Sequence, residues 1–110
     1  MFEGPNGADI EVFESRTFTK ALNKLDEGAL RVVEDEIDKI VAAPDIGTRK
    51  KGDLNYLWVH KFKIEGHEVL LGYSWNEGRL ELHLLNIGPH ENFYQAMKKR
   101  RKADLKIIGK

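Results

Sequence analysis

The chain has 110 residues, a length at which a single domain can bury one hydrophobic core. Its 41% hydrophobic and 33% charged residues are typical of a soluble globular protein. No apolar run is long enough to span a membrane, and the absence of cysteine excludes disulfide bonds and thiolate metal sites. The formal net charge is zero, but residues 1–48 hold five basic and eleven acidic residues, whereas residues 49–110 hold thirteen and seven. The second part therefore predicts a polyanion-binding surface, unless the charges mix in space.

The first expected element is a short strand at residues 10–14, preceded by a frayed segment because two glycines and a proline lie within residues 4–7. A helix follows, and the side-chain oxygen of Ser15 or Thr17 can accept a hydrogen bond from a free amide at its start. Its buried stripe recurs at helical spacing and consists of Phe18, Leu22 and Leu25.

A second helix begins after the break at residues 26–28 and ends before Pro44, because proline disfavours helix in the residue that precedes it. Its apolar stripe consists of Leu30, Val33, Ile37, Ile40 and Val41. We expect the two helices to form an antiparallel hairpin whose acidic outer face is solvated. Residues 45–53 are polar and are expected to form a linker.

The periodicity then becomes alternating in three segments, at residues 55–64, 67–75 and 80–87, which are rich in branched and aromatic side chains. Short glycine-bearing turns separate them, at residues 65–66 and 76–78. Two consecutive hairpins of this kind predict a three-stranded antiparallel meander.

The two faces of this meander follow from the alternation of side chains along a strand. The apolar face, which should cover the helices, carries Trp58, Phe62, Ile64, Val69, Leu71, Tyr73, Trp75, Leu80, Leu82 and Leu84. The opposite face carries Lys61, Lys63, Glu68, Gly72, Ser74, Arg79, Glu81 and His83. We therefore expect one ionisable sheet surface that could serve as a functional site.

Helical spacing returns after Gly88 and Pro89, and the chain ends in a basic tail. Three side chains of this helix can pack inward: Phe93, Ala96 and Met97. Another side of it carries Tyr94, Lys98 and Arg101, with His90 one turn before Tyr94.

The elements together predict an α+β fold. An N-terminal strand and a helical hairpin pack on one face of an antiparallel meander sheet, and a C-terminal helix follows. We expect a single domain over residues 1–110, with ends at residues 1–8 and 103–110 that can be flexible.

This order of elements resembles the RelE/ParE superfamily of bacterial toxins, over about residues 10–103. The stretch LWVHKFKIEGHEVLLGYSWNEGRLELHLLNIGPHENFY is similar to that family's core sheet, in which a basic strand precedes two apolar ones. Its closing residues, Gly88 to Tyr94, are similar to the endings of ParE-like and YoeB/HigB-like members, with a histidine and a tyrosine near the C-terminus.

The resemblance implies a toxin that an antitoxin encoded beside it holds silent, with no metal or cofactor. RelE, YoeB and HigB types cut messenger RNA in the ribosomal decoding site, whereas ParE types inhibit DNA gyrase without chemistry of their own. We expect the first activity, with the ribosome and mRNA as partners, and keep gyrase inhibition as the alternative. An ordinary small RNA- or protein-binding domain is a third hypothesis. No membrane partner is expected, and the absence of cysteine suits the cytoplasm.

RNA cleavage through the substrate's own 2′-hydroxyl needs a proton acceptor, a proton donor and a cation near the phosphorus. His90 is the first candidate for proton transfer, and Tyr94 could stack on a base or hold the phosphate. Lys61 aligns with a basic position of the RelE-type active strand. Glu68 stands where RelE-type toxins place an arginine; it would act as the proton acceptor, but the missing arginine favours the gyrase alternative.

Five further residues are candidates for binding RNA: Lys63, Arg79, His83, Lys98 and Arg101. Each candidate also has a purely structural interpretation: a solvated surface for the lysines, a turn for Arg79, the start of a helix for His90 and core packing for Tyr94. His60 falls on the apolar face, where a hydrogen-bonded structural histidine is expected. No pair of histidines has zinc-binding spacing, so we expect no metal.

Overall fold

The computed structural model describes residues 2–3 and 9–109, so the frayed segment expected at residues 4–7 lies outside the described residues. Its strands are β1 (Phe2–Glu3), β2 (Asp9–Glu14), β3 (Thr48–Arg49), β4 (Trp58–Ile64), β5 (His67–Asn76) and β6 (Glu81–Pro89). Its helices are α1 (Arg16–Leu22), α2 (Glu27–Ala42), α3 (Phe93–Lys99) and α4 (Arg101–Ile107), and a 3₁₀ turn covers Gly52–Leu54. Among these helices none combines the length and apolar character that crossing a membrane requires.

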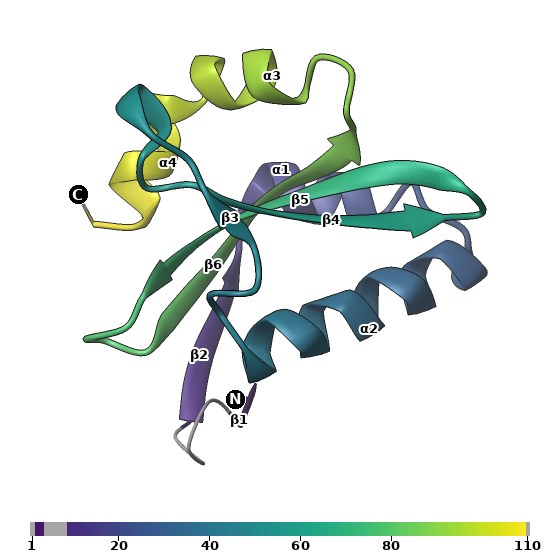
Figure 1. The fold of residues 1–110 in the computed structure, drawn as a ribbon, viewed down its shortest axis with the longest axis horizontal. Coiled ribbons are helices and arrows are strands. Elements are labelled where there is room, and N and C mark those ends of the chain that lie inside the picture. Colours follow the sequence, from purple (N-terminus) through teal and green to yellow (C-terminus); the bar gives the residue numbers. More distant parts are fainter. Residues whose placement is uncertain (1, 4–8, 110) are drawn as a thin grey trace.

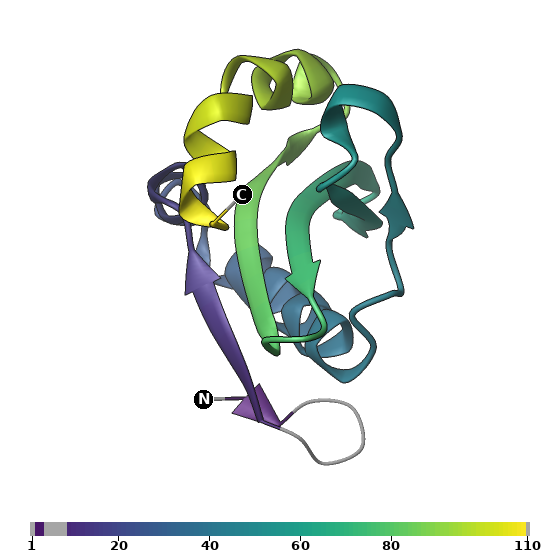
Figure 2. The ribbon, with the colours of Figure 1, turned by 90° about the vertical axis from the view of Figure 1, so that its left-hand side faces the viewer.

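The described strands form one sheet in the order β1-β2-β6-β5-β4-β3 (Figures 1 and 2). Strands β4, β5 and β6 form the predicted antiparallel meander. In its first turn Glu65 and Gly66 both have positive φ, 50° and 82°, which is the conformation of a two-residue type I′ hairpin. Strand β2 pairs in parallel with β6, so the N-terminal strand lies beside the last strand of the meander.

Side-chain caps define the starts of the first two helices. The hydroxyl of Ser15 accepts a hydrogen bond from the Phe18 amide at 3.0 Å and donates one to the Leu85 carbonyl at 2.6 Å. Asp26 accepts a hydrogen bond from the Ala29 amide at 2.8 Å and begins α2. The Ser15 bond to β6 therefore fixes α1 against the sheet as well as capping it.

Two hydrophobic cores lie on the two faces of the sheet. The first contains residues of α1 and α2 together with the predicted apolar face, including Phe18, Val33, Ile40, Tyr73 and Leu82. The second joins the opposite face to the C-terminal helices and the 3₁₀ turn, and contains Leu54, Tyr56, Leu57, Val59, Leu70, Leu85, Phe93, Met97 and Ile108. The α+β class is the predicted one, with helices on both faces instead of one.

The expectation of a polar face opposite the helical hairpin is therefore wrong over part of its length. Gly72, Ser74 and His83 are buried. Phe93 of α3 lies over Gly72, Phe13 of β2 stacks on His83, and Ile108 after α4 lies beside Ser74 and His83. The apolar side chains of Val59 and Leu70 share that face and provide the hydrophobic area on which the C-terminal helices pack. A bulge between Gly72 and Tyr73 also changes the alternation relative to β6.

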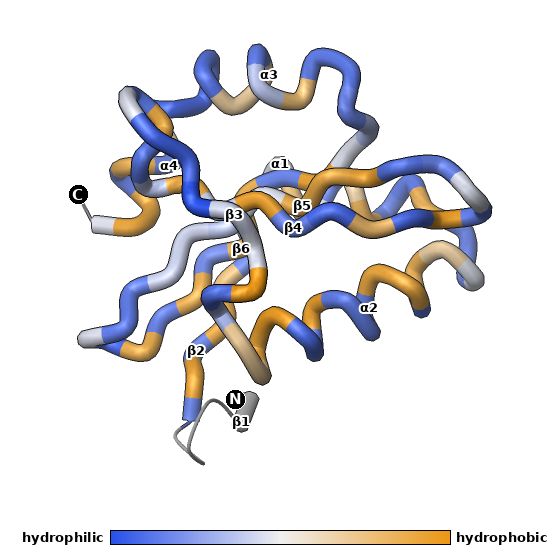
Figure 3. The backbone as a smooth tube through the Cα atoms, viewed as in Figure 1, coloured by the Kyte–Doolittle hydropathy of each residue, from blue (hydrophilic) through white to orange (hydrophobic). Residues whose placement is uncertain are grey.

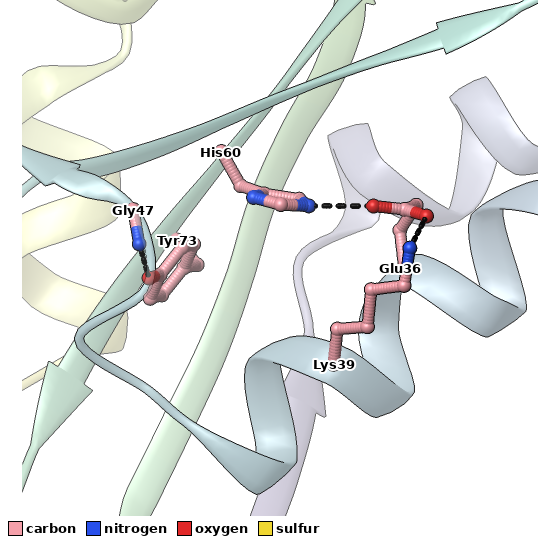
Figure 4. A network of polar contacts seen from close by, with 5 residues as sticks. All are labelled: Glu36, Lys39, Gly47, His60 and Tyr73. Atoms are coloured by element: carbon pink, nitrogen blue, oxygen red, sulfur yellow. Dashed lines mark hydrogen bonds and ion pairs between the residues drawn. The ribbon is translucent and has the colours of Figure 1, made fainter.

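The expected linker contains an edge strand. Residues Thr48 and Arg49 pair with Val59 and Trp58 as β3. Before it, the buried Tyr73 hydroxyl donates to the Pro44 carbonyl at 2.6 Å. The same hydroxyl accepts from the Gly47 amide at 3.0 Å (Figure 4). These bonds attach the end of α2 and the start of the linker to the centre of the sheet.

Candidate functional site

Three predicted site residues lie on one face of the sheet near the β4–β5 hairpin. In the strand register Lys63 is opposite Glu68, and Lys61 is opposite Leu70, whose other neighbour is Gly88 on β6. Because neighbouring strands are about 4.8 Å apart, the Cα atoms of Lys61 and Gly88 are separated by roughly 10 Å. The side chains of Lys61, Lys63 and Glu68 are exposed on this face.

His90 and Tyr94 lie just beyond the end of β6. His90 is exposed, and its ring meets the Tyr94 ring edge to face at a centroid distance of 6.1 Å. The last residue pair between β5 and β6 is Val69 with Pro89, so His90 follows the end of β6 and Glu68 precedes Val69 on β5. The end of β6 therefore brings the imidazole to the same end of the sheet as Lys61, Lys63 and Glu68.

The start of α3 is held by Phe93, which is buried against the sheet. It packs over Gly72, where an added Cβ would lie 3.0 Å from Phe93 Cζ. Asn92, directly before α3, adopts a left-handed conformation with φ of 63°. This turn orients Phe93 inward, while Tyr94 stays partly exposed beside His90.

Lys50 joins this group, although the sequence interpretation passed over it as part of the linker. Its ammonium group lies 5.0 Å from the centroid of the Tyr94 ring, within the range of a cation–π contact. The Lys50 amide donates to the Leu57 carbonyl at 2.8 Å, which fixes the backbone. The signal that could have revealed it is the run of three basic residues at positions 49–51, in the largely hydrophilic linker opposite α3 (Figure 3).

We define the basic face as Lys50, Lys61, Lys63, Glu68, His90 and Tyr94. No ion pair within 4.0 Å involves these residues in the described part of the chain. Lys61 and Lys63 supply two cations on this face that can attract a phosphate group locally. The carboxylates of Glu65, Glu68 and Glu91 are exposed at the same end of the sheet, and Lys50 lies toward the start of β4.

The other predicted RNA-binding residues are not all at this site. Lys98 is exposed on α3, one helical turn after Tyr94. The Arg101 Nε donates to the Asp53 carbonyl at 2.7 Å, so this residue attaches α4 to the 3₁₀ turn. Lys98 therefore lies on the same helix as Tyr94, whereas Arg101 is held beside Asp53 in the 3₁₀ turn.

Arg79 and His83 lie at the opposite end of the sheet, next to the β5–β6 turn. Arg79 Nε is 3.8 Å from a Glu81 carboxylate oxygen. His83 is buried and stacks on Phe13 at a centroid distance of 4.8 Å. From Glu81 to Pro89 the strand spans about 27 Å, so the structure does not bring these two residues together with His90.

His60 is the hydrogen-bonded structural histidine that was expected. Its Nε2 lies 2.7 Å from Oε1 of Glu36 on α2, and Lys39 donates to the other carboxylate oxygen at 2.7 Å (Figure 4). Burial alone would raise the pKa of Glu36, but the hydrogen bonds from Lys39 and His60 outweigh it and lower the pKa. This carboxylate therefore stays ionised and joins α2 to β4. In the described residues, no three His, Cys, Asp or Glu side chains are grouped to hold a metal ion.

The family model and three solved structures that match this chain describe toxins or toxin–antitoxin complexes. Residues 12–98 match the family described as ParE-like toxin of type II bacterial toxin-antitoxin system. Among solved structures, a free E. coli RelE double mutant matches with a TM-score of 0.64 and 16% identity, over 83% of this chain and 96% of that one. The RelBE2 toxin-antitoxin complex of Mycobacterium tuberculosis matches with a TM-score of 0.63 and 18% identity, over 76% and 100%. The intact E. coli RelBE complex matches with a TM-score of 0.61 and 14% identity, over 76% and 99%.

No curated protein sequence matches the chain significantly. At these identities the likeness to RelE structures establishes the fold alone. The match of residues 12–98 to the family model establishes the family.

Proposed function

Because the chain belongs to the ParE-like toxins of type II bacterial toxin-antitoxin systems, we propose that it inhibits growth as a metal-independent, ribosome-dependent mRNA endoribonuclease. The observation that supports this activity is the basic face. Lysines on the first meander strand, a carboxylate on the second, and the imidazole and phenol after the third lie at one end of the sheet. A gyrase inhibitor would not require such a set of acid, base and cationic groups.

The proposed reaction is an internal phosphoryl transfer. The 2′-oxygen of the RNA forms a bond to phosphorus while the bond from phosphorus to the 5′-oxygen breaks, which leaves a 2′,3′-cyclic phosphate and a 5′-hydroxyl. A base takes the proton of the 2′-hydroxyl, and an acid gives a proton to the departing 5′-oxygen. Proton transfer by positioned side chains typically contributes about 10²–10⁴-fold in rate.

We assign these roles by chemistry and position. Glu68 accepts the 2′-hydroxyl proton, since an ionised carboxylate is acceptor-only. His90 donates the proton to the leaving oxygen, because histidine is the side chain that ordinarily changes charge between about pH 5 and 8. Lys61 and Lys63 stabilise the negative charge that develops on the phosphorane oxygens. Tyr94 stacks on a base beside the scissile phosphate.

Gyrase inhibition remains the second candidate, and two observations favour it. The matching family is that of the ParE-like toxins. Glu68 also stands at the position where RelE-type toxins carry an arginine, and a carboxylate cannot neutralise a phosphorane dianion.

One experiment separates the two candidates. The protein is expressed briefly in a bacterial host, and new mRNA 5′ ends are mapped alongside DNA double-strand breaks. Cuts within translated codons that keep the reading frame support the ribonuclease. Broken DNA with intact transcripts refutes the ribonuclease and supports gyrase inhibition.

We also infer that an antitoxin protein is the physiological partner. The E. coli RelBE and M. tuberculosis RelBE2 structures in the comparison are toxin–antitoxin complexes, and the family is described as toxins of such pairs. Co-expression with the product of the adjacent gene should abolish growth inhibition and yield a complex that survives size-exclusion chromatography. Growth inhibition that persists despite a well-expressed neighbour would exclude that neighbour as the antitoxin.

A further inference from the structure

The end of β5 has an open edge. The last residue pair between β4 and β5 is Trp58 with Tyr73, so the segment 74–76 continues beyond the start of β4. On its other side this segment pairs with β6, Ser74 opposite His83. Backbone groups of residues 74–76 that point away from β6 therefore have no neighbouring strand within residues 2–3 and 9–109, a feature that natural sheets usually cover.

A cavity of about 220 Å³ occupies this open edge. The side chains that matter for its chemistry are Arg49, Tyr56, Trp58, Ser74, Trp75 and Glu77, and we call this cavity the edge notch. Both tryptophans of the chain line it. Aromatic rings beside an unpaired backbone edge can stack on a planar heterocycle and leave hydrogen-bonding groups at its rim.

The edge notch contains an unsatisfied donor. The Tyr56 hydroxyl is buried and has no hydrogen-bond partner among the described residues. Burial, together with the negative charge of Asp104, raises the pKa of Tyr56 to about 12 against the opposing effect of Arg101, so the phenol stays protonated. Buried hydroxyls normally find a partner. Because the oxygen is fully buried, a ligand atom can accept its hydrogen bond only after the Tyr56 side chain moves toward the notch.

A second cavity of about 220 Å³ adjoins the first, and the two share Ser74, Trp75 and Glu77. His83 lines this second cavity, and its side chain is only 9% exposed. Both of its ring nitrogens lack a hydrogen-bond partner, since the nearest Glu81 oxygen is 3.6 Å from Nε2. A neutral imidazole offers one donor and one acceptor, which matches the mixed edge of a nucleobase.

The cationic side chain of Arg49 lies at the entrance of the edge notch. Arg49 is exposed, and its Nε donates to the Asn55 carbonyl at 3.0 Å. This bond orients the guanidinium group and leaves its terminal nitrogens to face solvent or a phosphate. The notch thus combines two tryptophans that also pack on the first core, a polar interior, and a rim that carries the Arg49 cation and the Glu77 carboxylate.

We propose that the edge notch binds one unpaired nucleotide, with its base against the indole rings and its phosphate at Arg49. The notch is remote from the Glu68 end of the basic face, because the seven residues from Glu68 to Trp75 span about 23 Å. Only Lys50 of the basic face adjoins the notch, since it follows Arg49 in the chain. The notch is therefore a second contact for nucleotides, distinct from the site proposed for cleavage. Binding at the notch requires no cleavage and stands even if the ribonuclease proposal fails.

Intrinsic tryptophan fluorescence reports on the notch directly, because it contains both tryptophans. The purified protein is titrated with 5′-AMP and, separately, with adenosine. We expect saturable quenching by AMP and about threefold to fivefold weaker binding of adenosine, which lacks the phosphate. No saturable change up to about 10 mM AMP overturns the proposal.

Two conservative variants test the assigned contacts. Arg49→Gln should weaken AMP binding to the level of adenosine without changing adenosine binding. Tyr56→Phe should weaken both ligands about fivefold, the effect of one neutral hydrogen bond. Arg31→Gln, on the exposed surface of α2, is the matched control and should change neither. Equal losses in Arg49→Gln and Arg31→Gln would overturn the assignment, and thermal unfolding verifies that each variant is folded.

A further titration distinguishes a nucleotide within RNA from a free nucleotide. A 2′-O-methyl oligoadenosine of about six residues cannot be cleaved through a 2′-hydroxyl, so it measures binding alone. Affinity at least about tenfold above that of AMP, lost in Arg49→Gln, identifies an RNA strand as the ligand. Equal affinities of the oligomer and AMP identify the free mononucleotide.

Discussion

Phe93 packs directly over Gly72, and this contact connects the centre of the sheet to the helix that carries Tyr94. A Cβ added at Gly72 would lie 3.0 Å from Phe93 Cζ and 3.1 Å from Leu57 Cδ1. Glycine at this position lets the ring approach the backbone of β5 and holds the start of α3 against the sheet. Gly72 therefore helps to position the side chains of His90 and Tyr94, which precede and follow Phe93 in the chain.

Gly72→Ala should displace Phe93 and lower the free energy of unfolding by roughly 1–3 kcal/mol, the usual cost of overpacking a core. Growth inhibition should fall more than stability alone explains, because Tyr94 moves with α3. Urea unfolding and a growth assay at matched expression levels measure the two effects. The control is Gly78→Ala in the β5–β6 turn, where an added Cβ meets only the Asn76 side chain at 3.6 Å. Full growth inhibition in a destabilised Gly72→Ala variant would show that this contact does not position the site.

His90→Ala should abolish growth inhibition while leaving antitoxin binding intact, because the exposed imidazole is not part of either core. Loss of a general acid predicts a decrease in cleavage rate of about 10²–10⁴-fold. Primer extension on a translated mRNA measures cleavage, and co-purification measures binding. His67→Ala, an equally exposed histidine in the β4–β5 hairpin, serves as the control. A His90→Ala protein as toxic as the wild type removes His90 from the mechanism.

Lys50→Gln should lower the cleavage rate by about 10- to 100-fold with little change in stability, since it removes one cation beside Tyr94. Lys51→Gln provides the matched comparison, because Lys51 is an exposed neighbour with the same charge. Cleavage is followed as for His90, and the melting temperature is measured for both variants. If both substitutions reduce cleavage equally, only the general positive charge of the linker matters.

Asp104 predicts a pH dependence of stability. This residue on α4 is fully buried, its carboxylate oxygens accept no hydrogen bond from the described residues, and Arg100 Nε is 3.9 Å away. Burial raises the pKa of Asp104 from 3.8 to about 6, although the Arg100 charge opposes the shift. The folded protein therefore retains a proton that the unfolded chain releases. This contribution to stability is complete below about pH 4 and is lost as the pH rises through about 6.

Asp104→Asn removes this dependence, and at pH 7.5 it should raise the free energy of unfolding by roughly 2–3 kcal/mol. Urea unfolding at pH 4 and pH 7.5 provides the comparison. Asp53→Asn, an exposed carboxylate in the 3₁₀ turn, should show no such difference. A gain of the same size at both pH values would mean that Asp104 does not titrate in this range.

Local patterns were sufficient to predict most elements. Apolar spacing located α2, Ser15 is the cap of the two candidates Ser15 and Thr17, and the glycine-bearing turns defined the β4–β5–β6 meander. These features depend on interactions between residues close in sequence, or on the alternation along one strand, so they can be read without knowing the fold. The roles given to Lys61, Lys63, His90 and Tyr94 stay predictions, and the structure shows only where these residues lie.

The sequence by itself thus determined the class of the fold and most of the candidate residues, because periodicity and turn chemistry act over a few residues. Only the tertiary structure determined which of the candidate site residues lie close together. Packing of distant segments on the sheet buried His83 and Ser74, brought Lys50 to Tyr94, and separated Arg79 from His90 along the length of β6. Such contacts arise from the burial of apolar area between distant segments, which local spacing does not encode.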